Sequence, residues 1–194
     1  MPARRPHHRP RDRSVECELK FRVKGPRDHA RIRAALRKRG AKLEGKYDEE
    51  NYRFDGPGKS TRQSTLRLRV LNGGPRGVIT VKGPAHFVGG VKVREETEVE
   101  VKDAHATLDL LAQLGFVVEF TYNKHRHMWT LDGVVSVTLD QLDYGWFVEL
   151  EGPLEVLPTQ ARSLGFNPAK ALKDSYSVLA RKHLAKSKQP AATA

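Results

Sequence analysis

The sequence predicts an α+β domain with about eight strands, mostly antiparallel, and four helices. Three features predict it: strand-like segments separated by short turns, helical segments preceded by Asp and ended by Gly, and strands with one apolar and one charged face. The expected strands cover 14–24, 46–55, 64–71, 77–83, 91–102, 116–130, 134–142 and 145–151.

Turn and capping residues mark where these elements begin and end. Asn72-Gly73 and Asp132-Gly133 are hairpin signals between consecutive strands. Asp28 and Asp103 are the expected N-caps of two helices, because an Asp carboxylate accepts hydrogen bonds from free N–H groups of the first turn. The expected helices cover 28–39, 104–114, Pro158–Leu164 and a final segment from near Pro168, and 84–90 is an expected loop.

The first strand shows the charge pattern most clearly. Glu16, Glu18 and Lys20 share one face, whereas Cys17 and Leu19 lie on the other, because successive strand side chains alternate. For a single strand, a sheet with its charged face in water is the simpler interpretation.

The same pattern in about six strands favours a barrel over a water-facing sheet. Solvent-exposed sheets prefer opposite-charge or Ser/Thr pairs, but here like charges recur two residues apart. The apolar helix stripes also need the apolar strand faces, so closure of the sheet would turn the charged faces inward. These further inward-facing charges are Arg67, Arg69, Lys82, Lys92, Arg94, Glu96, Glu98, Glu100, Lys124, Arg126, Asp140, Glu149 and Glu151.

Acids and bases lining one interior need a compensating ligand, since unpaired buried charge is costly. Paired carboxylates at Glu-x-Glu spacing supply the hard oxygen ligands that suit Mg²⁺ or Mn²⁺. Arg and Lys suit phosphate oxygens. The combination indicates a metal–polyphosphate complex, and nucleic acid is not expected because it has no use for the acids.

A chain of 194 residues is consistent with one domain, expected over 14–184. The net charge of +12 is concentrated at the ends, where 1–13 holds five Arg against one Asp, and both this arm and the tail 185–194 are expected to be disordered. No apolar run is long enough for a membrane span. A single cysteine, Cys17, favours a cytoplasmic location.

The opening strand carries a Glu-x-Glu-x-Lys motif, and further short motifs follow it along the chain: Leu66–Arg69, Val81–Pro84, Arg94–Glu98, Lys124–Arg126, Leu139-Asp140, Phe147–Glu151 and Lys173–Tyr176. In this order the motifs resemble those of CYTH proteins, the triphosphate tunnel metalloenzymes. They are most similar to the class IV adenylyl cyclase branch of that family.

The resemblance implies a closed eight-stranded antiparallel barrel, helices packed outside, and a triphosphate bound inside with Mg²⁺ or Mn²⁺. The implied metal ligands are Glu16, Glu18, Glu98, Asp140, Glu149 and Glu151. The implied triphosphate contacts are Lys20, Arg67, Arg69, Lys82, Arg94, Lys124, Arg126 and, from the last helix, Lys173 or Lys170. Among them, Lys20, Arg69, Lys82 and Arg126 are the expected catalytic residues.

Two reactions fit this family. Attack by the ribose 3′-hydroxyl on the α-phosphorus of ATP gives cyclic AMP and pyrophosphate, whereas attack by water makes the protein a triphosphatase acting on thiamine triphosphate, tripolyphosphate or nucleoside triphosphates. A non-catalytic binder of polyphosphate or nucleic acid is the third hypothesis. The sequence leaves the oligomeric state open, a homodimer included.

Overall fold

The protein is described by a computed structural model covering residues 14–57 and 64–187. The arm expected over 1–13, and residues 188–194 of the expected tail, lie outside the described residues. Within the described part, every helix is too short or too polar for a membrane span.

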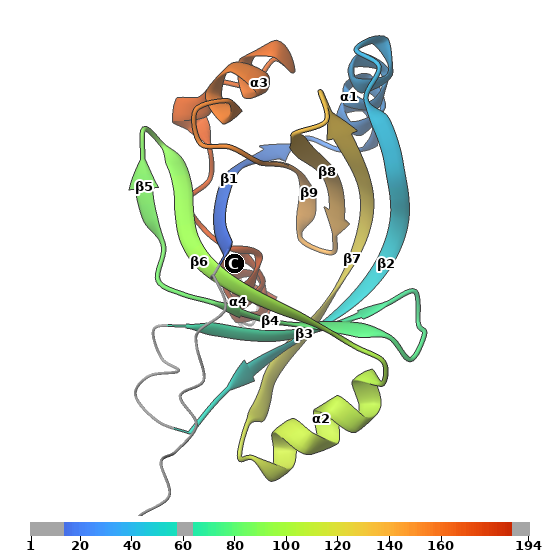
Figure 1. The fold of residues 1–194 in the computed structure, drawn as a ribbon, viewed down its shortest axis with the longest axis vertical. Helices are drawn as coiled ribbons and strands as arrows, with labels where there is room; N and C mark the ends of the chain where they lie inside the picture. Colours follow the sequence, from blue (N-terminus) through green and yellow to red (C-terminus); the bar gives the residue numbers. More distant parts are fainter. Residues whose placement is uncertain (1–13, 58–63, 188–194) are drawn as a thin grey trace, which may run out of the picture.

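Eight strands form a closed antiparallel barrel, which confirms the predicted fold class (Figure 1). Their order around the barrel is β1-β9-β8-β7-β2-β3-β4-β6, and the pairing of β6 with β1 closes the ring. The short β5 pairs with β6 alone. The strands are β1 (Ser14–Val23), β2 (Lys42–Asp55), β3 (Thr65–Leu71), β4 (Gly77–Lys82), β5 (His86–Val88), β6 (Val91–Val101), β7 (Val117–Leu131), β8 (Val135–Leu142) and β9 (Gly145–Glu151).

Helices cover the apolar outer faces of the strands. α1 (Pro26–Lys38) and α3 (Leu157–Ser163) pack on β1, β7, β8 and β9 through a core that includes Ile32, Leu36 and Leu150. α2 (Ala104–Gln113) lies on the opposite side of the barrel and packs on β2, β3 and β4 (Figure 1). The apolar faces are therefore buried under helices, and the charged faces point inward.

α4 (Tyr176–Ser187) has a different position, because it packs on side chains that belong to the inner face of the barrel. The Tyr176 ring meets the Phe147 ring edge to face, with centroids 5.2 Å apart. Phe147 has the same strand parity as the inward-facing Glu149 and Glu151. α4 therefore covers one end of the barrel, and it runs three residues past the expected domain end at 184.

The capping and turn predictions are mostly confirmed. The Asp103 carboxylate accepts a hydrogen bond from the Ala106 N–H at 2.9 Å, as expected for an N-cap. Asn72 and Gly73 both have positive φ, as do Asp132 and Gly133, which is the backbone that tight hairpins of this type require.

Asp28 is not an N-cap. Gly25 occupies the cap position, and α1 begins two residues earlier than expected, at Pro26. Proline favours the first helical turn because its fixed φ suits the helix and its missing N–H is not needed there. The Asp28 carboxylate instead lies within the first turn and accepts a hydrogen bond from the Lys24 N–H at 2.9 Å.

Three other boundaries were wrong. β2 begins at Lys42 rather than 46, since pairing with the long β7 carries it through the irregularity at Gly45. The expected loop 84–90 contains β5, which turns back on β6 through Gly89-Gly90. The last helix does not begin near Pro168. Residues Pro168–Lys170 form one 3₁₀ turn, and α4 starts at Tyr176.

The core beneath α1 and α3 offers a direct test of this packing. Leu150→Ala is expected to destabilise the protein by about 2–5 kcal/mol, because a fully buried side chain is truncated and a cavity remains. Urea unfolding monitored by circular dichroism measures the change. Leu110→Ala is the matched control: Leu110 is 55% exposed on α2, so its loss is expected to cost less than about 0.5 kcal/mol. Equal losses in the two variants would contradict the assigned faces.

Candidate active site

The barrel encloses a charged cavity of about 640 Å³. Most of the charges predicted to face inward do line it, six Glu and seven Lys or Arg in all. These are Glu16, Glu18, Glu96, Glu98, Glu149, Glu151, Lys20, Arg67, Arg69, Lys82, Arg94, Lys124 and Arg126. Five of the six expected metal ligands and seven of the eight expected triphosphate contacts therefore share one cavity.

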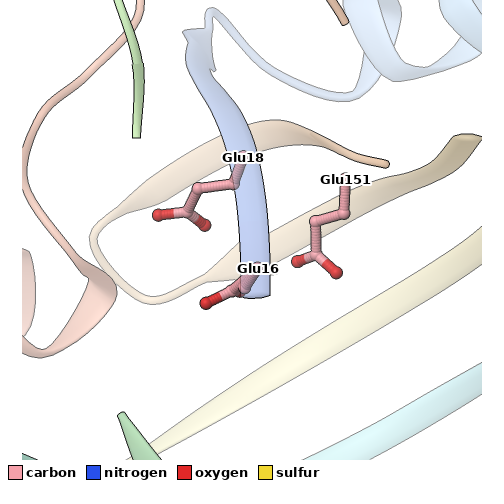
Figure 2. Close-up of side chains that lie close together, drawn as sticks. All are labelled: Glu16, Glu18 and Glu151. Carbon is pink, nitrogen blue, oxygen red and sulfur yellow. The ribbon is translucent and has the colours of Figure 1, made fainter. Parts of the chain in front are cut away.

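Three carboxylates gather on β1 and β9 (Figure 2). Glu16 and Glu18 are two residues apart on β1, and Glu18 is the direct cross-strand partner of Glu151. One ligand oxygen of each of the three lies within 4.8 Å of the others. We refer to Glu16, Glu18 and Glu151 as the carboxylate cluster.

The electrostatics of the cluster suit a cation. Burial, together with the neighbouring carboxylates of Glu149 and Glu16, raises the pKa of Glu151 to about 7. Within the described residues, Glu151 has no ion pair or hydrogen bond from its side chain. The pKa of Glu16 is lowered to about 2, because Lys82 and Arg94 outweigh the opposing effect of burial.

The donor set fits Mg²⁺ or Mn²⁺, because all three groups are carboxylates and hard divalent cations prefer oxygen ligands. Within residues 14–57 and 64–187, the Glu151 carboxylate has no positive partner in contact, and a divalent ion held at the cluster would supply one. A soft-metal site is not supported by these donors, since they include neither sulfur nor imidazole.

Bases on the neighbouring strands are paired with acids of the cavity wall. The Lys82 Nζ lies 2.8 Å from Glu16 and 2.8 Å from Glu96, and the Arg94 Nε lies 2.7 Å from Glu16. On β3, the Arg69 Nη2 lies 3.1 Å from Glu98. Each base thus points into the cavity while its charge is balanced by a carboxylate.

The deep end of the cavity, next to α4, holds a second group of charges. The Lys20 Nζ is 3.0 Å from Glu149 and lies over the Tyr176 ring, 4.2 Å from its centroid. Arg126 donates two hydrogen bonds to Asp140, at 2.7 and 2.6 Å, and one to Glu149 at 2.9 Å. The Tyr176 hydroxyl donates to Asp140 at 2.8 Å.

Asp140 is not brought to the cavity wall or to the carboxylate cluster. Its side chain is fully buried behind Arg126, which lowers the pKa of Asp140 against the effect of burial. Strand alternation predicts that Asp140 faces the inside of the barrel, as the structure shows. Alternation does not show how far along the barrel axis a side chain lies. On β9 the partner of Asp140 is Phe147, at the end covered by α4. In this arrangement Asp140 positions Arg126.

Lys173 and Lys170 do not line the cavity either. Lys173 is exposed, and its Nζ lies 5.5 Å from the centroid of the Phe87 ring on β5. The expectation depended on a helix running from Pro168, and the chain between Lys170 and α4 is not helical.

The sequence analysis assigned no role to three buried charges, of which Glu96 shares Lys82 with Glu16 and the other two are Glu49 and Lys92. Glu49 on β2 lies 3.0 Å from the Lys124 Nζ and 3.4 Å from Arg69. The run Asp48-Glu49-Glu50 obscured it, because three successive acids give no alternation from which a face can be read. Lys92, noted on the inward face of its strand, contacts Glu18 at 2.6 Å and holds that cluster carboxylate.

Comparison with known proteins agrees with this geometry. Residues 14–159 match the CYTH domain family. The chain belongs to the CYTH family. The predicted resemblance is thereby confirmed at the level of the family.

Among relatives of this CYTH protein, "Putative adenylate cyclase MJ0240" of Methanocaldococcus jannaschii is 27% identical over 71% of this chain and 76% of its own length. The PH1819 protein of Pyrococcus horikoshii has a TM-score of 0.72 at 27% identity, covering 87% of this chain and 99% of its own. The Hippeastrum "putative adenylyl cyclase HpAC1", described as having a dominant triphosphatase activity, has a TM-score of 0.65 at 20% identity, over 86% of this chain and 96% of its own.

Glu49 allows a test of the buried charge network. Burial raises its pKa, but Lys124, Arg126 and Arg69 together lower the pKa to about 2 from an ordinary 4.5. A lowered pKa stabilises the fold above the ordinary value, and that stability is lost as the pH falls toward 2. Glu49→Gln is therefore expected to cost about 3 kcal/mol at pH 7.

Urea unfolding of wild type and Glu49→Gln between pH 7 and pH 2 measures this cost. The difference should shrink steadily below about pH 4.5 and nearly vanish near pH 2. Glu50→Gln, a change at the adjacent exposed acid, is the control and should leave the wild-type profile unchanged. A Glu49→Gln cost that stays constant across this range would show that charge is not its cause.

Proposed function

We propose that this protein is a metal-dependent enzyme that acts on triphosphates inside its barrel, with class IV adenylyl cyclase activity that converts ATP to cyclic AMP and pyrophosphate. The observation that carries the proposal is the carboxylate cluster beside seven bases in one cavity, with Glu151 unpaired among the residues that the structure describes. The cluster suits a divalent ion and the bases suit phosphate oxygens, so together they match a metal–triphosphate complex.

In this proposal Glu16, Glu18 and Glu151 hold Mg²⁺ or Mn²⁺, with Glu98 and Glu149 as further acids of the wall. When bound, the metal neutralises charge that develops on the phosphoryl oxygens. Arg67, Arg69, Lys82, Arg94 and Lys124 bind and orient the triphosphate, and Lys20 and Arg126 stabilise charge at the deep end.

The ion pairs of the cavity wall hold these bases in position before the substrate binds. Lys82 and Arg94 share the Glu16 carboxylate, so a cation bound to Glu16 would compete for the same oxygens. Phosphate oxygens would then take the place of the carboxylate as partners of both bases. Positioning and charge neutralisation, rather than a covalent intermediate, carry the catalysis.

Triphosphate hydrolysis is the alternative, with water in place of the ribose hydroxyl. It is supported by the Hippeastrum relative, whose fold is shared and whose described activity is dominantly triphosphatase. The relative from Methanocaldococcus, named as a putative adenylate cyclase, supports cyclisation. A non-catalytic anion binder is disfavoured, because six cavity carboxylates would weaken anion binding.

Product analysis separates the reactions. The purified protein is incubated with Mg²⁺ or Mn²⁺ and with ATP, thiamine triphosphate or tripolyphosphate. Cyclic AMP with pyrophosphate is the expected product from ATP. Orthophosphate with a diphosphate would instead establish the hydrolase, and no metal-dependent turnover of any of the three would overturn the proposal.

Two variants test the assigned groups. Glu151→Gln is expected to reduce metal-dependent turnover to near background, since the cluster loses one of its three carboxylates. Arg69→Ala is expected to lower kcat by about 10²–10³-fold, the usual cost of losing one group that stabilises developing charge. Circular dichroism verifies folding. Glu100→Gln, at an exposed acid two residues beyond Glu98 and outside the cavity, is the control and should retain full activity.

Lys173 was expected from the sequence to contact the triphosphate, but its side chain lies outside the cavity, so replacing it tests that expectation. Because its side chain is exposed outside the cavity, Lys173→Ala is expected to leave the KM for the triphosphate within about twofold of wild type. Steady-state kinetics beside Lys82→Ala, whose base does line the cavity, provide the comparison. A rise in KM for Lys173→Ala as large as for Lys82→Ala would restore the original assignment.

A further inference from the structure

One buried amide of the barrel wall, that of Asn51 on β2, has no hydrogen-bond partner. The side chain is fully buried, and neither its nitrogen nor its oxygen has a partner within residues 14–57 and 64–187. Buried amides are almost always hydrogen-bonded, because an unmade bond leaves the cost of removing the amide from water uncompensated. Asn51 has no part in the site described above, so an isolated amide at this position needs an explanation.

Strand pairing places Asn51 among bases that are proposed to contact phosphate. Its direct cross-strand partner on β3 is Arg69, and the Cβ atoms of such a pair lie on the same face, about 4.5–5.5 Å apart. Arg67, two residues along β3, and Glu49, two residues along β2, face the same side. Around the ring, β2 is four strands from β1 in either direction, so this wall lies away from the carboxylate cluster.

The two arginines beside Asn51 are only partly balanced by acids. Among the described residues, the one acid in contact with Arg67 is Glu98, at 3.8 Å, and the same Glu98 oxygen lies 3.1 Å from Arg69. The Nε of each arginine has no hydrogen-bond partner in the described part of the chain. Burial and the charge of Arg67 lower the pKa of Arg69, although Glu49 and Glu98 act in the opposite direction. Positive charge on this wall therefore remains available to a ligand.

The same wall stabilises a buried carboxylate. Burial raises the pKa of Glu49, yet Lys124, Arg126 and Arg69 lower it to about 2. Asn51→Asp would keep the size of the side chain and give it the guanidinium partner that the amide lacks. The protein instead has a neutral side chain whose polar atoms are unpaired, and this choice leaves the two neighbouring arginines without a further acid.

We propose that Asn51 is a positioning residue that sets how tightly the cavity binds a triphosphate, because its neutral side chain leaves Arg67 and Arg69 available to phosphate oxygens. The inference rests on the proposed function, since it takes the triphosphate site as given. Asn51 does not itself line the cavity, so it acts through the two arginines. Stability lost at the unpaired amide is thereby linked to affinity for the anion.

Three variants test this role by equilibrium binding and by urea unfolding without ligand. A non-hydrolysable imido analogue of tripolyphosphate is titrated with Mg²⁺ into the full chain and followed by calorimetry. Asn51→Asp adds a negative charge at constant size, whereas Asn51→Leu removes the amide and keeps the position neutral. Asn123→Asp is the matched control, because it makes the same chemical change at an exposed residue of β7.

Asn51→Asp is expected to bind the analogue about tenfold more weakly than wild type, because the new carboxylate competes with phosphate for the arginines. Its urea midpoint should lie above that of wild type, since the carboxylate gains partners that the amide lacks. Asn51→Leu and Asn123→Asp should both bind the analogue within about twofold of wild type.

Three results would overturn the role of Asn51 while leaving the triphosphate site intact. They are unchanged affinity in Asn51→Asp, an equal loss of affinity in Asn51→Leu or Asn123→Asp, and a urea midpoint for Asn51→Asp below that of wild type. Failure of the wild-type protein to bind the analogue would instead overturn the proposed function, and this inference with it.

Discussion

The antiparallel pairing of β1 with β6 is the constraint on which the rest of the structure depends. It closes the sheet, so every strand has an inside and an outside, and alternation then assigns one set of side chains to each. The apolar set meets the helices. Most of the charged set is buried or half-buried and is balanced by ion pairs within the barrel.

That balance explains why acids and bases are interleaved across strands rather than grouped by sign. Arg94 on β6 lies directly across from Glu16 on β1, and Lys20 on β1 lies directly across from Glu149 on β9. Each pair satisfies a buried charge at short range. The exception among the described residues is Glu151, which the pairing of β9 with β1 places where two other carboxylates can share a cation with it.

The sequence allowed the inward face to be predicted because strand alternation is a local property. Alternation alone was enough to predict that the charged residues of the β1 motif and the Arg67–Arg69 pair face inward, and both lie in the cavity wall. Depth along the axis and the path between elements depend on distant pairings, so alternation could not show that Asp140 lies behind Arg126 or that Lys173 lies outside the cavity. Glu49 was overlooked for a local reason, since its neighbours on both sides are also acids.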